Sequence, residues 1–336
     1  MTKIAKLSLA VLAIAGMSAT AGTLQDVQKD GFIKCGVDGG MPGFSEVVGG
    51  GVYKGIDVDG CRAVAAAVLG DASKVKYVAL NAKERLAALQ SGEIDLLARV
   101  TTWTHTRDTA LGLNFAGVNY YDGQGFMVHK SLGVTSAKQL DGASVCLQTG
   151  TTTELNVADY FRTQGMKYET VAYDTNDQVV QSYDSGRCDV LTSDASQLYG
   201  IKTKLTHPAD NIVLPEIISK EPLGPVVRQG DDQWFNIVKW SFFAMVEAEE
   251  DGITSKNIDS LASSTNPKIK RFLGTEGTLG ANLGLNADWA YQIVKQVGNY
   301  GEVFERNIGT STPLNIERGL NALWTNGGLQ YSPPFR

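Results

Sequence analysis

Short apolar runs alternate with amphipathic segments along the first third of the chain. The runs at 32–37, 76–80 and 94–98 are typical of buried strands, and the segments at 55–70 and 83–91 have helical spacing. Each predicted helix is followed or closed by a glycine, which is a usual C-terminal stop signal. This alternation predicts a doubly wound α/β unit.

The same pattern then starts again, which predicts a second α/β unit. Its elements are predicted strands at 143–147, 168–173 and 188–191 and predicted helices at 152–163 and 177–185. Six further segments complete the prediction: a short helix at 23–29, extended stretches at 115–128 and 212–227, and C-terminal helices at 233–250, 255–260 and 288–304. The two extended stretches indicate that the chain leaves the first unit, builds the second and returns.

A glycine-rich segment, 39–51, lies between the first predicted strand and helix. A phosphate-binding loop would continue into lysine and serine or threonine, and this segment does not. We therefore interpret it as a mobile surface loop.

The N-terminus has the pattern of a secretory signal peptide. Lys3 and Lys6 precede an apolar run at 7–15, and Ala19-Thr20-Ala21 is a small-x-small cleavage site. The run is too short to span a bilayer, so we expect residues 1–21 to be removed and the mature protein to be exported without membrane insertion.

Composition agrees with a folded, exported, acidic protein. The 336 residues are 43% hydrophobic and 20% charged, with a formal net charge of -6. Removal of 1–21 takes two lysines and no acidic residue, which makes the balance about two units more negative. An acidic chain without a basic run is a poor candidate for nucleic acid or anionic lipid.

The chain contains four cysteines, Cys35, Cys61, Cys146 and Cys188. An even count in an exported protein predicts disulfides, and three pairings are possible. The sequence does not choose among them. Nearest-neighbour pairing, Cys35 with Cys61 and Cys146 with Cys188, is the most economical.

Sequence motifs for catalysis, cofactors or metals are missing. The chain has no GxGxxG, GxxxxGK[ST], GxSxG, HExxH or CxxC. Its three histidines, His105, His129 and His207, lie far apart and lack metal-ligand spacing. We therefore expect no enzyme activity, no cofactor and no metal site.

One candidate binding element directly follows the predicted strand at 94–98. Thr104 is a good helix N-cap, which places Arg107 in the first helical turn. The Arg107 guanidinium, the Thr102 hydroxyl and the helix N-terminus would then converge at a strand end. This geometry suits a carboxylate.

The second unit offers a matching element. Thr151 and Glu154 have capping-box spacing, so Thr152 would lie at a helix N-terminus. Asp194 ends the strand that begins at 188, and its carboxylate suits an ammonium group. Because open α/β sheets bind ligands at such strand ends, the two elements together predict a zwitterion site.

These residues resemble the polar amino-acid-binding periplasmic proteins of ABC importers, in particular the general L-amino-acid-binding subgroup. The similarity covers nearly the whole mature chain. The matching segments are the helix signature at 55–65, 101–107, 120–127, 148–152, Asp194, 215–225 and 297–302. Within the helix signature, this chain has Gly60 where the family prefers a large apolar residue.

The resemblance implies a type II periplasmic-binding-protein fold, an α/β fold in which two hinge strands join two lobes around an interlobe cleft. Residues 22–119 and 223–336 would form lobe 1, with a C-terminal helical extension, and 120–222 would form lobe 2. Arg107, Thr102 and Thr152 would bind the ligand α-carboxylate, and Asp194 its α-ammonium.

The resemblance also places residues around the ligand side chain. Asp38 would face the pocket, and Met41 stands where relatives often stack an aromatic ring. Gln148 would reach the side chain from lobe 2. Arg85 and Arg99 lie near the same cleft by their position in the chain, and either could meet an acidic or amide side chain. Surface ion pairs are a nearly equally good interpretation of both arginines.

The expected function is capture of L-amino acids, broadly but with preference for acidic and amide side chains. The partners would be free L-amino acids and the membrane subunits of an ABC permease. The protein would be a monomer in the periplasm of a Gram-negative bacterium. Two alternatives are a dehydratase-like periplasmic enzyme on the same fold and a ligand-sensing module for a receptor.

Overall fold

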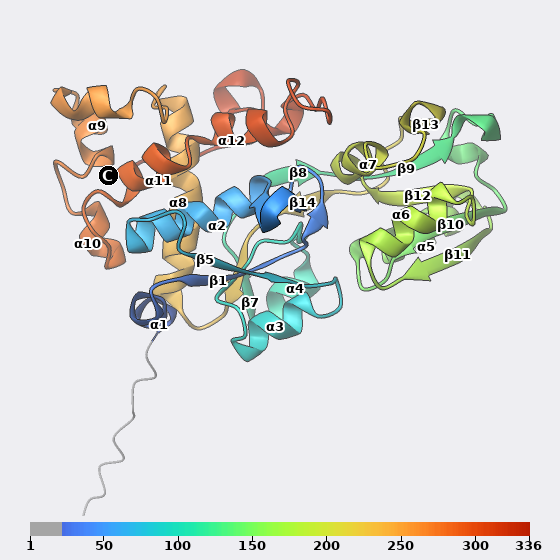
Figure 1. Cartoon of the computed structure of the whole chain (residues 1–336), viewed down its shortest axis with the longest axis horizontal. Helices are drawn as coiled ribbons and strands as arrows, with labels where there is room; N and C mark the ends of the chain where they lie inside the picture. The colour runs from blue at the N-terminus through green and yellow to red at the C-terminus, as the bar shows by residue number, and fades with distance from the viewer. Residues whose placement is uncertain (1–21) are drawn as a thin grey trace, which may run out of the picture.

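The computed structural model describes residues 22–336, so the predicted signal peptide lies outside the described residues. Two five-stranded sheets lie side by side along the long axis of the molecule (Figure 1). We call each sheet with its helices a lobe. Lobe 1 contains the sheet of β1, and lobe 2 contains the sheet of β10.

The sheet of lobe 1 has the strand order β5-β1-β6-β15-β7. β1 pairs in parallel with β5 and β6, and β15 runs antiparallel to β6 and β7. The elements of its first part are α1 (Thr23–Asp30), β1 (Ile33–Val37), α2 (Ile56–Leu69), β5 (Val75–Ala79), α3 (Arg85–Ser91), β6 (Leu96–Leu97), α4 (His105–Ala110) and β7 (Leu113–Phe115). The sequence predicted β1, β5, β6 and the longer helices of this lobe correctly, whereas β7 was missed.

The sheet of lobe 2 has the order β11-β10-β12-β9-β13. β10 pairs in parallel with β11 and β12, whereas β9 is antiparallel to β12 and β13. Its elements are β9 (Gln124–His129), β10 (Ala143–Gln148), α5 (Thr152–Gln164), β11 (Tyr168–Tyr173), α6 (Asn176–Asp184), β12 (Val190–Asp194), α7 (Ala195–Lys202) and β13 (Asn211–Val213). These bounds confirm the predicted repetition of strand and helix.

Helices cover both faces of each sheet, because neighbouring strand residues point to opposite sides. In lobe 1, Leu96 belongs to the core under α2 and α8 (Asp232–Glu250), and Leu97 belongs to the core under α3. In lobe 2, Val190 packs toward α5 and Leu191 toward α6 and α7. Each lobe therefore has its own pair of hydrophobic cores.

The chain passes between the lobes along two short strands that pair with each other. β8 (Tyr120–Asp122) and β14 (Glu221–Leu223) are antiparallel, with Asp122 opposite Glu221. After β14 the chain enters β15 (Val226–Arg228) in lobe 1. The pair lies between the two lobes (Figure 1) and has the position expected of hinge strands.

The C-terminal part packs mainly on lobe 1, and its Asn321 side chain also bonds the backbone of Tyr121 on hinge strand β8. It contains α9 (Pro267–Phe272), α10 (Leu279–Leu283), α11 (Trp289–Gln296) and α12 (Tyr300–Asn307). The single helix predicted at 288–304 is wrong: Gly298 has φ of 99°, and the Asn299 side chain caps a new helix by accepting from the Glu302 amide. The segment predicted as a helix at 255–260 is a 3₁₀ helix over Ile258–Ser263.

The glycine-rich segment is not a simple loop. It forms a three-stranded antiparallel sheet of β2 (Gly40–Met41), β3 (Ser45–Val48) and β4 (Val52–Lys54). Met41, which stands where relatives often stack an aromatic ring, lies in the core of lobe 1 at 2% exposure and does not line the ligand pocket. The loop interpretation failed because glycines occupy the turns and the strands between them are short.

Both cysteine pairs form disulfides within a lobe. Cys35 joins Cys61, linking β1 to α2, and Cys146 joins Cys188, linking β10 to the segment before β12. Their Cα atoms are 6.3 and 5.8 Å apart, respectively. The nearest-neighbour pairing is confirmed, and neither bond crosses the hinge.

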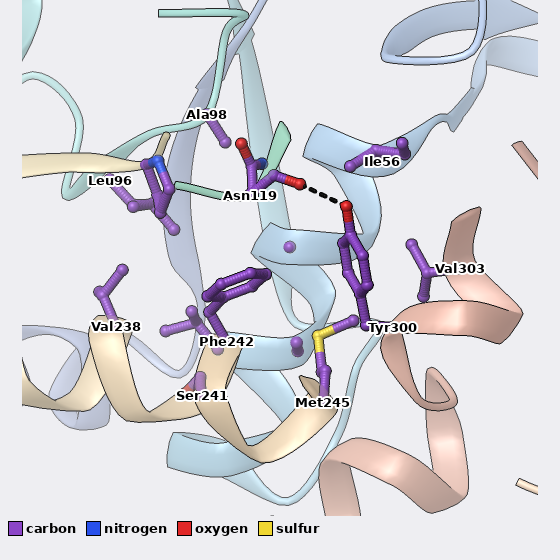
Figure 2. Close-up of a pocket in the computed structure, with 14 residues that line it drawn as sticks. Ile56, Leu96, Ala98, Asn119, Val238, Ser241, Phe242, Met245, Tyr300 and Val303 are labelled. Atoms are coloured by element: carbon purple, nitrogen blue, oxygen red, sulfur yellow. Dashed lines mark hydrogen bonds between the residues drawn. The ribbon is translucent and has the colours of Figure 1, made fainter. Parts of the chain in front are cut away.

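A small apolar cavity lies between α2, α8 and α12. Its volume is about 30 Å³, and Gly60 is part of its wall together with Phe242 and Met245. Figure 2 shows the Tyr300 ring at this cavity and its hydroxyl donating to the Asn119 carbonyl, at 2.8 Å. A Cβ atom added at Gly60 would meet no atom within 4 Å, so the structure has room for a larger residue there.

We predict that Gly60→Ala stabilises the protein by about 1 kcal/mol, because alanine is the better helix former and the new methyl group enters unfilled space. This corresponds to a rise in Tm of about 2 °C. Gly70→Ala is the matched control: Gly70 ends the same helix with φ of 70°, so alanine there should destabilise. Urea unfolding checks both variants, and a loss of stability in Gly60→Ala would contradict the packing shown here.

Candidate functional site

A polar cavity lies between the lobes, at the carboxyl ends of β6, β10 and β12. Its volume is about 30 Å³, and we call it the inner cavity. A wider space of about 390 Å³, the outer chamber, adjoins it and shares Arg99, Gln148 and Asn176 with its wall. Strand ends of both sheets therefore meet at one site, as expected for ligand binding by open α/β sheets.

Six of the eight predicted ligand-binding residues line the inner cavity. These are Arg85, Arg99, Thr102, Gln148, Thr152 and Asp194. Asp38 lines the outer chamber instead. Arg107 is absent from both walls and lies buried behind Thr102, at 8% exposure.

The predicted helix cap before Arg107 is confirmed. The Thr104 hydroxyl accepts a hydrogen bond from the Arg107 backbone N–H at 3.3 Å, which starts α4. The Arg107 side chain donates from Nη1 to the Thr102 carbonyl at 2.9 Å. Burial lowers the pKa of Arg107, and the carboxylates of Glu221 and Asp194 oppose this effect.

The backbone before Thr102 is held in a strained conformation. Val100 has φ of 41°, which a β-branched residue rarely adopts. The Asp57 carboxylate, at the start of α2, accepts from the Val100 N–H at 2.8 Å. Arg85 Nη1 donates to the carbonyls of Arg99 and Val100, at 2.9 and 3.3 Å. Asp57 and Arg85 together fix the course of the chain into the site.

The two candidate side-chain arginines differ in what they already bind. Arg99 forms an ion pair with Asp38 and donates from Nε to the Leu80 carbonyl at 2.7 Å. Arg85 is 2% exposed, and its Nε has no hydrogen-bond partner within residues 22–336. Burial, Arg99 and Arg107 lower the pKa of Arg85. Neither arginine forms a surface ion pair, since both are buried.

The helix start in lobe 2 differs from its prediction. Thr151 makes no capping bond to α5; its hydroxyl donates to the Gln148 carbonyl at 2.7 Å, and Glu154 accepts from the Gly150 N–H. The capping-box prediction is therefore wrong. The local turn at Gly150, with φ of 74°, brings the threonine back over the strand end.

Asp194 is the acidic group of the inner cavity. It is 4% exposed and accepts a hydrogen bond from Gln197 Nε2 at 2.6 Å. Burial raises its pKa well above the ordinary value, and the neighbouring carboxylates of Asp122 and Glu221 raise it further. A cation in the cavity would relieve this repulsion.

Asn176 is a cavity residue that the sequence analysis missed. It begins α6 directly after β11, is 8% exposed and lines both the inner cavity and the outer chamber. Its Nδ2 has no hydrogen-bond partner in the described part of the chain. The signal that pointed to Thr152, a strand end followed by a helix start, is also present at Asn176.

Several direct contacts hold the lobes together. Thr102 and Thr152 bring their hydroxyl oxygens within 3.3 Å of each other. Lys83 of lobe 1 forms a salt bridge with Asp174 of lobe 2 at 2.6 Å, and the Lys204 ammonium donates to the Gly40 carbonyl. The structure is therefore a closed conformation. Over residues 22–336, no cluster of His, Cys, Asp and Glu is arranged to hold a metal ion.

This architecture matches a known family. Residues 33–260 match the model of the bacterial extracellular solute-binding proteins, family 3. The chain belongs to this family. Its members bind solutes, which agrees with the prediction of a binding protein rather than an enzyme.

Two curated relatives and one solved structure are similar to this family 3 protein over nearly its whole length. The general L-amino acid-binding periplasmic protein AapJ of Rhizobium johnstonii is 58% identical, over 99% of this chain and 98% of the relative. The glutamate/glutamine/aspartate/asparagine-binding protein BztA of Rhodobacter capsulatus is 55% identical, over 98% of each chain.

The solved structure is an ABC transporter periplasmic binding protein from Brucella ovis with glutathione bound. It is 55% identical to this family 3 protein and covers 94% of this chain and all of its own, with a TM-score of 0.93. The match confirms the two-lobe type II fold. Among the helices of residues 22–336, none has the length and apolar character needed to cross a membrane.

We predict that Asp57 makes stability depend on pH. Burial raises its pKa from 3.8 in the unfolded chain to about 6 in the folded protein. The folded state then holds the proton more tightly, so this contribution is complete below about pH 4 and is lost as pH rises through about 6.

The pKa difference corresponds to a loss of up to about 3 kcal/mol in the free energy of unfolding between these pH values. Asp57→Asn keeps the acceptor for the Val100 N–H and removes the titration. Urea unfolding between pH 4 and 7 should show that the free energy of unfolding changes less with pH in the variant than in the parent. Parallel dependences on pH would contradict the assignment.

Proposed function

We propose that the protein captures L-amino acids in the inner cavity and delivers them to an ABC permease. The observation that carries this proposal is the closed polar cavity between two lobes, with Asp194 on one side and buried arginines on the other. A free amino acid carries the matching ammonium and carboxylate. The amino-acid-binding relatives support this ligand class.

In this proposal Asp194 binds the α-ammonium and Arg107 supplies the charge for the α-carboxylate. Arg107 lies behind Thr102 and outside the cavity wall, and its Nη1 donates to the Thr102 carbonyl, so in the closed form its positive charge would act on the carboxylate from behind this residue. Thr102 and Thr152 contribute the polar wall between these two charges. Closure of the lobes on the ligand is driven by its higher affinity for the closed form.

The unpartnered donors of the cavity favour acidic and amide side chains. Arg85 Nε and Asn176 Nδ2 are buried without acceptors, and a ligand oxygen would satisfy them. Arg99 is occupied by Asp38, so Arg85 is the better candidate for the side-chain contact. Gln148 also lines this region, and its Nε2 donates to the Asp174 carbonyl.

A second ligand class is a γ-glutamyl peptide such as glutathione. Its glutamyl end carries the same α-ammonium and α-carboxylate, and its γ-amide would replace the side chain of glutamine. The outer chamber, about 390 Å³ in volume, adjoins the inner cavity and leaves room for the rest of the peptide. The glutathione-bound structure from Brucella ovis supports this possibility.

We further propose that the protein works as a monomer in the periplasm and that its lobes are 22–119 with 223–336 and 120–222. The periplasmic relatives and the N-terminal pattern support the location. The β8–β14 pair supports both lobe boundaries. The relatives that are 55–58% identical are binding proteins, which argues against a dehydratase-like activity.

We predict that Arg107→Met and Asp194→Asn each abolish measurable binding while the protein stays folded. Removing one partner of a buried charge pair costs about 2–5 kcal/mol, or roughly 30- to several-thousand-fold in affinity. Calorimetric titration with glutamate and glutamine measures the loss, and circular dichroism checks the fold. Near-normal affinity in either variant would refute its assigned role.

We also predict the order of ligands in a thermal-shift screen of the L-amino acids. Glutamate, aspartate, glutamine and asparagine should raise Tm more than leucine or phenylalanine at equal concentration, and D-isomers should have little effect. An apolar side chain would leave buried donors unpaired, at about 1–3 kcal/mol each.

Asn176→Ala should weaken glutamine binding about 3- to 10-fold and alanine binding much less. Asn282→Ala, an exposed position on α10, is the control. If branched or aromatic ligands give the largest shifts, the polar-pocket argument is wrong.

A further inference from the structure

Glu221 is a buried carboxylate on hinge strand β14. Its four hydrogen-bond donors are all uncharged, and the charge of the buried Arg107 guanidinium lies near it. Glu221 is 1% exposed. Its Oε2 accepts from the hydroxyls of Thr102 and Thr152 at 2.6 and 2.9 Å. Its Oε1 accepts from Asn156 Nδ2 and the Ser219 hydroxyl, each at 2.6 Å. Within residues 22–336 it takes part in no salt bridge.

The four donors come from different parts of the molecule. Thr102 follows β6 of lobe 1, whereas Thr152 and Asn156 lie on α5 of lobe 2. Ser219 precedes β14 on the hinge segment itself. One carboxylate oxygen thus receives one hydroxyl proton from each lobe, at the place where the chain crosses between them (Figure 1).

This arrangement depends on closure. If the lobes separate, Thr102 and Thr152 move apart, and Glu221 loses at least one donor of its four. A buried carboxylate that loses a donor pays a larger penalty than a neutral group, because hydrogen bonds to charged groups are the stronger ones. Glu221 also lies outside the inner cavity wall, so a ligand would touch the two threonines rather than the carboxylate.

We propose that Glu221 is a positioning residue that favours the closed conformation, because it binds Thr102 and Thr152 together at the hinge. It also sets their hydroxyl orientation. Each threonine has one hydroxyl proton, and both protons point to Glu221. The oxygens therefore present lone pairs to the cavity and do not donate to a ligand carboxylate, contrary to the expectation from the sequence. Asp122, directly opposite Glu221 in the hinge pair, and Asp194 add to the negative charge of this wall.

The test compares Glu221→Gln with Glu216→Gln in the full mature chain without ligand. Glutamine keeps the shape of Glu221, but its amide offers a single acceptor oxygen and removes the charge. Glu216 precedes β14 on the same segment, and its carboxylate accepts from Ser136 and Ala137, both of lobe 2. It is therefore a matched carboxylate that does not link the lobes.

Lobe separation is measured between spin labels on Glu93→Cys and Thr163→Cys, two exposed positions in lobe 1 and lobe 2. The native cysteines are all in disulfides and do not react. We expect Glu221→Gln to lower the closed-to-open ratio at least about tenfold, whereas Glu216→Gln leaves it unchanged. Identical distance distributions in Glu221→Gln and the parent would overturn the proposal.

A second pair of variants covers the case in which Glu221→Gln does not fold. Thr102→Val removes the lobe 1 donor, and Thr102→Ser keeps it. The valine variant should open and the serine variant should stay closed; equal behaviour of the two would also overturn the proposal. The ligand-free readout does not depend on the proposed function, so it stands even if no amino acid binds.

Where glutamine or glutamate does bind, stopped-flow dissociation provides the ligand readout. Glu221→Gln should release the ligand at least about tenfold faster, because the closed form is less stable. A change in Tm without any change in lobe separation or release would indicate a merely structural role and would contradict the proposal.

Discussion

The fold depends on one covalent constraint: the chain crosses between two independently packed sheets and must cross back. The two crossing strands, β8 and β14, pair with each other, so both passages occur at one narrow place. Each lobe has its own hydrophobic cores on either side of this place. The lobes can therefore rotate about the strand pair without breaking either core, and the ends of the parallel strands face each other across the cleft.

The charges buried in the cleft follow from this arrangement. Arg85 and Arg99 extend from lobe 1 into a space that closure removes from water, and Asp194 does so from lobe 2. Such groups are costly to bury unless they are paired. Asp38 compensates Arg99, and backbone carbonyls compensate part of Arg85. The donors and charges left over in the closed form are those that a polar ligand can satisfy.

Local patterns in the sequence predicted most of the strands and helices, because buried parallel strands and amphipathic helices have distinct hydrophobic periods. These patterns failed where a glycine can either continue an element or interrupt it. At Gly298 a positive φ breaks a helix, and in 39–51 the glycines form turns between short strands. The strand-end rule also found Thr102, Thr152 and Asp194.

Other site properties depend on contacts between distant segments, which no local pattern records. The Glu221 network joins residues up to 119 positions apart. The burial of Arg107 behind Thr102 and the pairing of Arg99 with Asp38 arise only when the strands come together. The disulfide pairing could be guessed from economy alone, and the sheet then brings each pair of cysteines within reach.

The C-terminal helices α9 to α12 pack on lobe 1, so the two halves of the molecule differ greatly in bulk (Figure 1). Rotational friction increases steeply with size. In free solution, lobe 2 would sweep through most of the closing angle while lobe 1 turned little. A protein held by a partner through lobe 1 would therefore close about as fast as a free one. Held through lobe 2, it would have to swing its heavier half and would close more slowly.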